Sequence, residues 1–230
     1  MNFGAEVILL QTTHNNKTAA EQQSPLPTVM DDDPLTLTGI QKHLLIPDLS
    51  LTIRREVTST NTLLRQTAMD GAKEGTVLLA QKQTGGKGRM GRAFYSPADT
   101  GVYCSILLRP QSLDLCDAAN VTTIAAVAAC EAIEFAGAGS ASIKWVNDVF
   151  VSGKKVCGIL TEGAVDPATS QAEFLIVGVG INVYPPRDGF PPELSHIAGS
   201  VFPTIRPDGR NRLAAFFLNR FFAYYKTEEK

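Results

Sequence analysis

The chain has 230 residues, of which 44% are hydrophobic and 19% are charged, and its formal net charge is -2. A chain of this length and apolar content can bury a sizeable core in one compact unit without disulfides or metals. The small net charge excludes a molecule whose overall electrostatics would draw it to nucleic acid or to an anionic membrane, so any basic function has to be local.

The N-terminal part of the chain has a different composition from the rest. Residues 11–34 are rich in Thr, Asn, Gln, Ser, Pro and Asp, so we expect residues 1–48 to be a flexible polar segment that precedes one folded unit at 49–230. No basic residue precedes the short apolar patch at residues 7–10, which argues against a secretory signal or a transit peptide.

Two further features indicate the compartment. We expect no apolar run of the roughly 18 residues that a membrane-spanning helix requires. The four cysteines are widely spaced in apolar or alanine-rich stretches with no histidine nearby, which is typical of reduced packing residues. A cytoplasmic protein is the resulting prediction.

The first half of the folded unit alternates short β-type runs with a helical one. A hydroxyl of Thr58 or Ser59 can accept hydrogen bonds from the free N–H groups at a helix start, so a helix is predicted there. The predicted elements are a strand at 51–57, a helix from about 59 to 69, a strand at 76–81, a basic glycine-rich loop at 82–97 and a strand at 102–108.

The second half continues this mixed pattern. A small-residue helix is expected to end at Gly137, where glycine suits a left-handed conformation. Ser152-Gly153-Lys154 favours a hairpin turn, which places Lys155 near the hairpin tip. The predicted elements are a helix at about 117–136, strands at 142–145, 149–151, 156–161 and 174–183, and a final helix at 209–227 with an aromatic stripe facing the core.

The loop at residues 83–92 reads QTGGKGRMGR and interleaves three cations with four glycines. Glycines let backbone N–H groups face a ligand, while Lys and Arg supply charge to carboxylate and phosphate oxygens. Such a loop can wrap an anion. A mobile solvated loop, or a nonspecific nucleic-acid patch, fits the segment alone equally well.

Three other segments indicate a function only when they are considered together. Residues 144–148 read KWVND and 154–162 read KKVCGILTE, which alone could be a decorated hairpin with a turn. Residues 178–183 read GVGINV, and glycines inside an apolar strand can mark close approach of a ligand or merely relieve crowding. Upstream, Ser59-Thr60-Asn61 stands at the predicted helix start.

In this order and spacing, the segments resemble those of the biotin protein ligase family, also called holocarboxylase synthetase. Its members carry an STN triplet, a GRGRxGR loop, a KWPND segment, a KxxGIL stretch and a GxGINV strand, and each has a counterpart between residues 50 and 227. The resemblance implies an α+β fold with a mixed, largely antiparallel sheet packed with helices, of the class II synthetase-like type. It also implies ATP-dependent activation of biotin to biotinyl-5'-AMP and transfer of biotin to a lysine.

The resemblance also implies roles for single residues, with ATP, biotin and Mg²⁺ as the small molecules bound. Lys155 and Arg89 would act at the reacting centre, and Asp148 would contact the metal ion. The implied biotin contacts are Ser59, Thr60, Asn61, Gln83, Lys87, Gly88, Arg89, Lys155, Gly158 and Gly180. The implied ATP contacts are Arg89, Arg92, Phe94, Lys144, Asn147 and Asn182.

Some positions depart from the family pattern. Lys87 replaces the usual arginine, Val146 the usual proline and Phe94 a common tryptophan. Lys87 lacks the bidentate fork of arginine, so a weaker grip on carboxylate or phosphate is expected. We expect the family's small C-terminal β-barrel to be absent and, because residues 1–48 show no helix-turn-helix pattern, no DNA-binding role.

The implied partner is a biotin carboxyl carrier protein or a biotin-dependent carboxylase, with no membrane or nucleic acid, and a homodimer is compatible with the sequence. Two alternatives stay open at this stage. A lipoate ligase or octanoyl transferase would share the fold and similar acyl chemistry, although the GKGRMGR loop and the KWVND segment favour biotin. A regulatory nucleic-acid-binding module would use only the basic loop.

Overall fold

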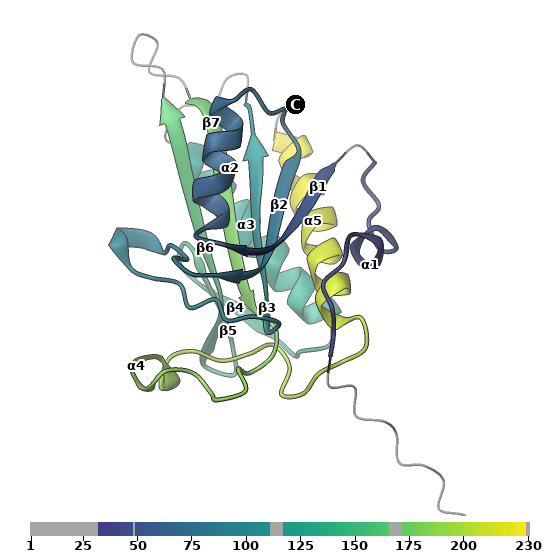
Figure 1. Cartoon of the computed structure of the whole chain (residues 1–230), viewed down its shortest axis with the longest axis vertical. Helices are drawn as coiled ribbons and strands as arrows, with labels where there is room; N and C mark the ends of the chain where they lie inside the picture. The colour runs from purple at the N-terminus through teal and green to yellow at the C-terminus, as the bar shows by residue number, and fades with distance from the viewer. Residues whose placement is uncertain (1–31, 48, 111–116, 166–171, 229–230) are drawn as a thin grey trace, which may run out of the picture.

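The structure, a computed structural model, describes residues 32–47, 49–110, 117–165 and 172–228. It is built on a seven-stranded sheet with the strand order β1-β2-β3-β7-β6-β5-β4 (Figure 1). The strands are β1 Ser50–Val57, β2 Thr76–Gln83, β3 Gly101–Leu108, β4 Ala141–Lys144, β5 Asp148–Val151, β6 Lys154–Val165 and β7 Ala172–Asn182. Among the seven strands of the described residues, only β1 and β2 pair in parallel, which confirms the expected mixed, largely antiparallel sheet.

Helices cover both faces of this sheet. Figure 1 shows α2 on one face, and α3 and α5 together on the opposite face. The helices are α1 Leu37–Gln41, α2 Thr60–Met69, α3 Asp117–Phe135, α4 Pro192–Ser195 and α5 Gly209–Glu228, with a single 3₁₀ turn, η1, at Arg89–Gly91. The expected α+β class is therefore confirmed.

The alternation of strand side chains divides the core into two parts. Every residue of β3 is buried, because the strand is covered on both faces. Ile106 belongs to the large core with α3 and α5, whereas its neighbour Leu107 packs in a small second cluster with Leu64 of α2. The α2 face holds few apolar residues, so part of that face is free for polar groups.

The folded unit begins earlier than the sequence predicts. Leu35 and Ile40 are 2% and 0% exposed and belong to the large core, and α1 packs against α5. Asp33 is also buried and accepts a hydrogen bond from the hydroxyl of Tyr184 at 2.8 Å. The expected flexible segment reaching residue 48 is therefore wrong for residues 33–47, where a few apolar side chains and one paired carboxylate outweigh the polar composition. Residues 1–31 lie outside the described part.

Most predicted elements are present within a few residues of their expected ends. Ser59 is the N-cap of α2, and Gly137 follows α3 with φ of +82°. Ser152 and Gly153 both have positive φ, 49° and 75°, as a two-residue hairpin turn requires, and Lys155 follows at the start of β6. The expected aromatic stripe of α5 is buried and ends at Tyr225.

The apolar helix α3 and the cysteines bear on two expectations from the sequence. Residues 118–135 of α3 form a helix long and apolar enough to cross a membrane, with a mean hydropathy of 1.3, so the expectation of no such run is wrong. The alanine-rich helix packs against β6 and α5, and half of this window is buried in the core. Cys104, Cys130 and Cys157 are free thiols, as expected, while Cys116 lies outside the described residues.

Candidate active site

The N-terminus of α2 forms one wall of the candidate site. Ser59 has an extended backbone (φ -154°, ψ 134°), and its side chain accepts a hydrogen bond from the N–H of Thr62. Thr60 donates to Gln83 Oε1 through its backbone N–H at 2.8 Å and its hydroxyl at 3.1 Å. Ser59, Thr60 and Asn61 are all buried, so this capped turn keeps its polar groups inside the molecule.

Asn61 is fixed from several sides. Its Oδ1 accepts a hydrogen bond from Ser105 Oγ at 2.6 Å, and its Nδ2 donates to Glu162 Oε2 at 2.8 Å and to the carbonyl of Leu160 at 3.2 Å. Gly178 lies directly against it, because a Cβ at that position would approach Asn61 Oδ1 to 2.1 Å. The amide therefore has one orientation, and it needs glycine on β7 beside it.

The glycine-rich segment belongs to the β2–β3 loop, residues 84–100. The N–H of Gly88 donates to the carbonyl of Arg92 at 2.7 Å, and the N–H of Phe94 donates to the carbonyl of Gly86 at 2.9 Å. These two bonds fold the segment into a tight turn. The loop therefore has a defined path that returns Phe94 toward the sheet.

The loop and the β5–β6 hairpin meet at one place. Arg89 Nη1 donates to Asn147 Oδ1 at 2.8 Å, and Lys155 Nζ lies 2.6 Å from Asp148 Oδ1. Asn147 Nδ2 donates to the same Asp148 oxygen at 2.9 Å, which completes a chain of polar contacts from Arg89 to Lys155. The loop cation Arg89 and the hairpin lysine Lys155 therefore lie at the same place in the fold.

The ring of Phe94 separates two spaces above the sheet. Gly158 of β6 pairs with Gly180 of β7, and the ring lies over both. A Cβ at Gly180 would be 2.4 Å from the ring, and one at Gly158 would be 3.0 Å from it. Tyr103 supports the ring from the side in an edge-to-face contact, with 6.5 Å between centroids.

Two cavities meet at this ring, one of about 50 Å³ and one of about 660 Å³. Gly88, Arg89, Phe94, Asn147 and Lys155 line both of them. The first is also lined by Ser59, Thr60, Asn61, Gln83, Lys87, Cys104, Gly158, Ile159, Leu160, Gly178, Val179 and Gly180. The second is also lined by Met90, Arg92, Ala93, Tyr95, Lys144, Asp148, Phe150, Asn182, Phe190, Leu194, Ile197 and Ala198.

The structure brings together the residues singled out in the sequence. Every residue expected to contact biotin lines the first cavity. Every residue expected to contact ATP lines the second, together with the expected metal contact Asp148. The two sets overlap where the cavities meet, because Gly88, Arg89, Phe94, Asn147 and Lys155 line both.

A metal ion would find one carboxylate here. Within the described ranges, no group of three or more His, Cys, Asp and Glu side chains could hold a metal ion. Asp148 is the acidic residue among those that line the second cavity, and it is paired with Lys155. Mg²⁺ is commonly held by one or two carboxylates together with substrate phosphates. The residues therefore fit a metal ion that arrives with phosphate ligands, and they do not form a preformed cage.

Several site residues were missed by sequence reasoning. Ser105 is fully buried and is a serine inside an apolar run of the sequence, and Glu162 ends the KKVCGILTE stretch. Their positions in the sequence could therefore have identified both. No sequence pattern identifies the apolar wall of the second cavity, which is formed by Phe190, Leu194 and Ile197. These three lie in or beside α4 and belong to no motif, and only the fold brings them to the cavity.

The sequence of this chain is similar to those of known proteins. The model of the biotin/lipoate A/B protein ligase family matches residues 53–182. The chain is 38% identical over 160 residues to the bifunctional ligase/repressor BirA of Bacillus subtilis strain 168, covering 70% of this chain and 46% of that protein. It is 33% identical over 167 residues to the biotin--[acetyl-CoA-carboxylase] ligase of Mycobacterium tuberculosis, covering 70% of this chain and 58% of that protein.

Solved structures are similar as well. The biotin protein ligase of Aquifex aeolicus, in complex with biotin and ATP, superposes with a TM-score of 0.65 and 30% identity, covering 78% of this chain and 72% of that one. The chain spans about half the length of the curated relatives it matches, between 46% and 58% in the two cases above.

Proposed function

This chain belongs to the biotin/lipoate A/B protein ligase family, and we propose that it activates biotin with ATP and transfers the biotinyl group to a lysine of an acceptor protein. One observation carries the proposal: a small polar cavity and a large cation-bearing cavity meet at Arg89, Phe94 and Lys155. Two substrates bound in these cavities would have their reactive ends at the same point. The similarity to a ligase structure that holds biotin and ATP supports this pairing.

The small cavity suits the ureido head of biotin. A cyclic urea offers two N–H donors and one carbonyl acceptor, and Thr60, Asn61 and Gln83 provide hydroxyl and amide groups to meet them. An apolar dithiolane or alkyl chain could make no hydrogen bond with these hydroxyl and amide groups. The chemistry of the cavity therefore favours biotin over lipoate or octanoate.

The loop has to move as biotin enters. The 50 Å³ cavity is well below the roughly 300 Å³ at which small-molecule sites begin. Lys87, Gly88 and Phe94, all from the β2–β3 loop, line this cavity. We propose that these groups shift outward to admit biotin and close again over its carboxylate, which would keep water from the adenylate.

The cations offset the repulsion between the reactants. The biotin carboxylate attacks the α-phosphate of ATP, forming the mixed anhydride and releasing pyrophosphate. Two unit charges 4 Å apart repel by about 4 kcal/mol at an effective dielectric of 20, or roughly three orders of magnitude in rate. With the loop closed, Arg89 and Lys155 would be held by Asn147 and Asp148 and would neutralise this charge.

Mg²⁺ is proposed as the ion bound with the phosphates, where it would neutralise charge on the departing pyrophosphate. Asp148 is the residue that would contact it. The residues of this chain do the rest: Arg92 and Lys144 contact phosphate oxygens, and Asn182 and Phe94 lie beside the nucleoside. Lys155 orients the carboxylate through its fixed ammonium group.

The second half-reaction needs only an acceptor amine. A neutral lysine amine attacks the carbonyl carbon of the anhydride, an amide bond forms, AMP leaves and the amine loses a proton. We propose a biotin carboxyl carrier protein or a biotin-dependent carboxylase as the acceptor, in the cytoplasm. We further propose that the described unit from residue 33 onward supplies all groups for both steps.

The test is substrate-dependent pyrophosphate release. The protein is incubated with Mg²⁺-ATP and either biotin, lipoate or octanoate, and pyrophosphate and the adenylate are measured. We expect pyrophosphate release with biotin but not with lipoate or octanoate. Turnover only with lipoate or octanoate would replace the assignment by a related acyl ligase, and no release with any acid would refute the proposed activity.

A further inference from the structure

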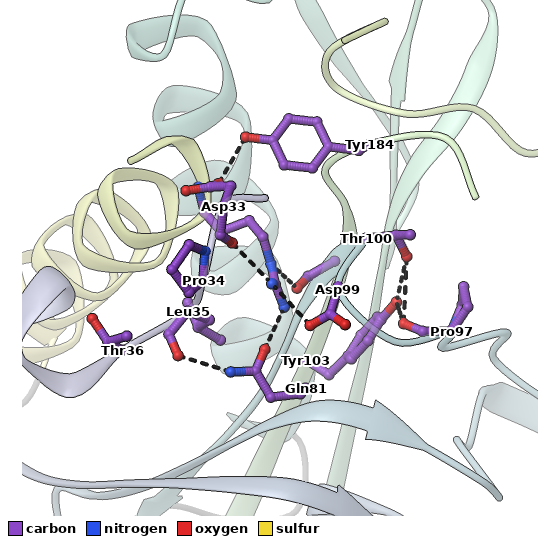
Figure 2. A network of polar contacts seen from close by, with 12 residues as sticks. Asp33, Pro34, Leu35, Thr36, Gln81, Pro97, Asp99, Thr100, Tyr103 and Tyr184 are labelled. Atoms are coloured by element: carbon purple, nitrogen blue, oxygen red, sulfur yellow. Dashed lines mark hydrogen bonds and ion pairs between the residues drawn. The ribbon is translucent and has the colours of Figure 1, made fainter. Parts of the chain in front are cut away.

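A buried charge lies outside both cavities. Arg210, the second residue of α5, is 0% exposed, and it lines neither the small nor the large cavity. Its guanidinium donates to the carbonyl of Gly101 at 3.0 Å, to the carbonyl of Asp33 at 3.1 Å and to Gln81 Oε1 at 2.8 Å. Figure 2 shows Asp33, Gln81 and Asp99 gathered in this network.

The acceptors of Arg210 are mainly neutral. Asp99 Oδ1 lies 3.6 Å from Nη1, but its side chain is 67% exposed, and the Asp33 carboxylate accepts from the backbone N–H of Arg210 instead. Burial lowers the pKa of the Arg210 guanidinium, because a charge away from water is costly. An apolar residue would fill this space without that cost. The guanidinium differs from an apolar residue in its directed hydrogen bonds, so its role depends on the groups that accept those bonds.

They hold both ends of the β2–β3 loop. Gln81 lies in β2 two residues before its end at Gln83, and Gly101 is the first residue of β3. Gln81 is itself fixed by a hydrogen bond from its Nε2 to the carbonyl of Leu35 at 2.8 Å. One planar group therefore contacts the strand that enters the loop and the strand that leaves it.

The contact at Gly101 leads to the partition between the cavities. A Cβ at Gly101 would lie 2.6 Å from the ring of Tyr103, so that ring packs on the backbone that Arg210 holds. The hydroxyl of Tyr103 donates to the carbonyl of Pro97 at 2.9 Å, and burial raises its pKa to about 12, which keeps it a donor. Its ring supports Phe94. The path from Arg210 to Phe94 consists of direct contacts.

We propose that Arg210 is a positioning residue for the active site: it fixes the two ends of the β2–β3 loop in register, so that Arg89 and Phe94 are placed at the junction of the cavities. The guanidinium does not touch substrate. Its kinetic effect rests on the proposed function, whereas its effect on the loop does not.

The test compares Arg210→Met with Arg212→Met, a change two residues along the same helix. Methionine keeps much of the length of the side chain and removes all donors. Arg212 is exposed, and its side chain has a ring contact with Phe216, with Cζ 5.7 Å from the ring centroid, so it serves as the matched control. Hydrogen exchange without any ligand is measured at the amides of Gln83, at the end of β2, and of Gly88 and Phe94 in the loop, which all donate hydrogen bonds.

In Arg210→Met, exchange at these amides is expected to be about tenfold faster, with no change in the β6–β7 amides, and Arg212→Met is expected to match the unchanged chain. Biotin KM in pyrophosphate release is expected to rise about tenfold with a smaller change in kcat. Wild-type exchange in a folded Arg210→Met, or equal acceleration in Arg212→Met, overturns the proposal.

A second variant guards against a failure to fold. Gln81→Met removes one acceptor and leaves the guanidinium its bonds to Gly101 and Asp33, so a smaller acceleration at the same amides is expected. Unchanged exchange in Gln81→Met also counts against the proposal. If the exchange effect is found but no acid drives pyrophosphate release, the positioning role stands and the proposed function fails.

Discussion

The two faces of the central sheet use the same strands for opposite purposes. On the face covered by α3 and α5, the strands contribute one continuous apolar core that includes Ile106, Val177 and Ile159. On the face covered by α2, their sequence neighbours include Ser105, Gly178 and Gly158, which contact or make room for the groups of the candidate site. The small cluster under α2 contains only six buried residues, so apolar packing ends where the site begins.

This difference shows how one alternating pattern encodes both stability and chemistry. Successive strand residues point to opposite faces, so a single-residue step moves a substitution from the core to the site. Changes on the α3 and α5 face should therefore alter the free energy of unfolding, and changes on the α2 face should alter ligand binding or rate. Substitutions on each face can test this separation.

Lys155→Ala is expected to lower the rate of adenylate formation by at most roughly three orders of magnitude, because Arg89 alone then has to offset about 4 kcal/mol of charge repulsion. The melting temperature should change little, since the side chain is 28% exposed and its main partner is Asp148. Lys82→Ala is the control, because Lys82 of β2 pairs with Glu56 of β1 and lines neither cavity. Unchanged pyrophosphate release in Lys155→Ala would remove Lys155 from the reacting centre.

Gly178→Ala is expected to weaken biotin binding about thirtyfold, a cost of about 2 kcal/mol for overpacking. The new Cβ would meet Asn61 Oδ1 at 2.1 Å, and Asn61 cannot turn away because Ser105 and Glu162 hold its amide. Gly163→Ala on β6 is the control, where the nearest contact is the end of the Leu175 side chain at 3.1 Å. Calorimetric titration with biotin measures both, and equal affinities would show that Asn61 is not fixed.

The neighbours Ser105 and Ile106 provide the sharpest test of the two faces. Ser105→Ala removes the hydroxyl that hydrogen-bonds with Asn61 Oδ1 and Thr60 Oγ1, and it should raise biotin KM about tenfold. Ile106→Val should cost about 1 kcal/mol in the free energy of unfolding, with biotin KM unchanged. Denaturant unfolding and steady-state kinetics of both variants decide. A comparable KM change in both would mean that the faces are coupled.

How much the sequence could predict follows from the range of the forces involved. Local signals located the Ser59 cap, the turn after Val151 and the glycines of β7, because each requires a residue type at one position. The packing of residues 33–47 was missed, since one buried carboxylate and two apolar side chains do not stand out in a polar segment. The contacts of Arg210 were missed for the same reason: they join four segments far apart in the chain, and no local pattern reports them.

Lys87→Arg is expected to have the smallest effect and to strengthen binding on the α2 face. Lys87 lines the small cavity, and its ammonium lies 3.9 Å from Glu162 Oε1, a loose and half-exposed pair. A guanidinium can bind a carboxylate with two parallel hydrogen bonds, so biotin KM should fall about threefold, within the range of a partly exposed ion pair. Because the gain is electrostatic, it should shrink as salt rises from 0.05 to about 0.5 M. A lower KM that is insensitive to salt would assign the gain to packing, and an unchanged KM would mean that Lys87 does not reach the carboxylate when the loop closes.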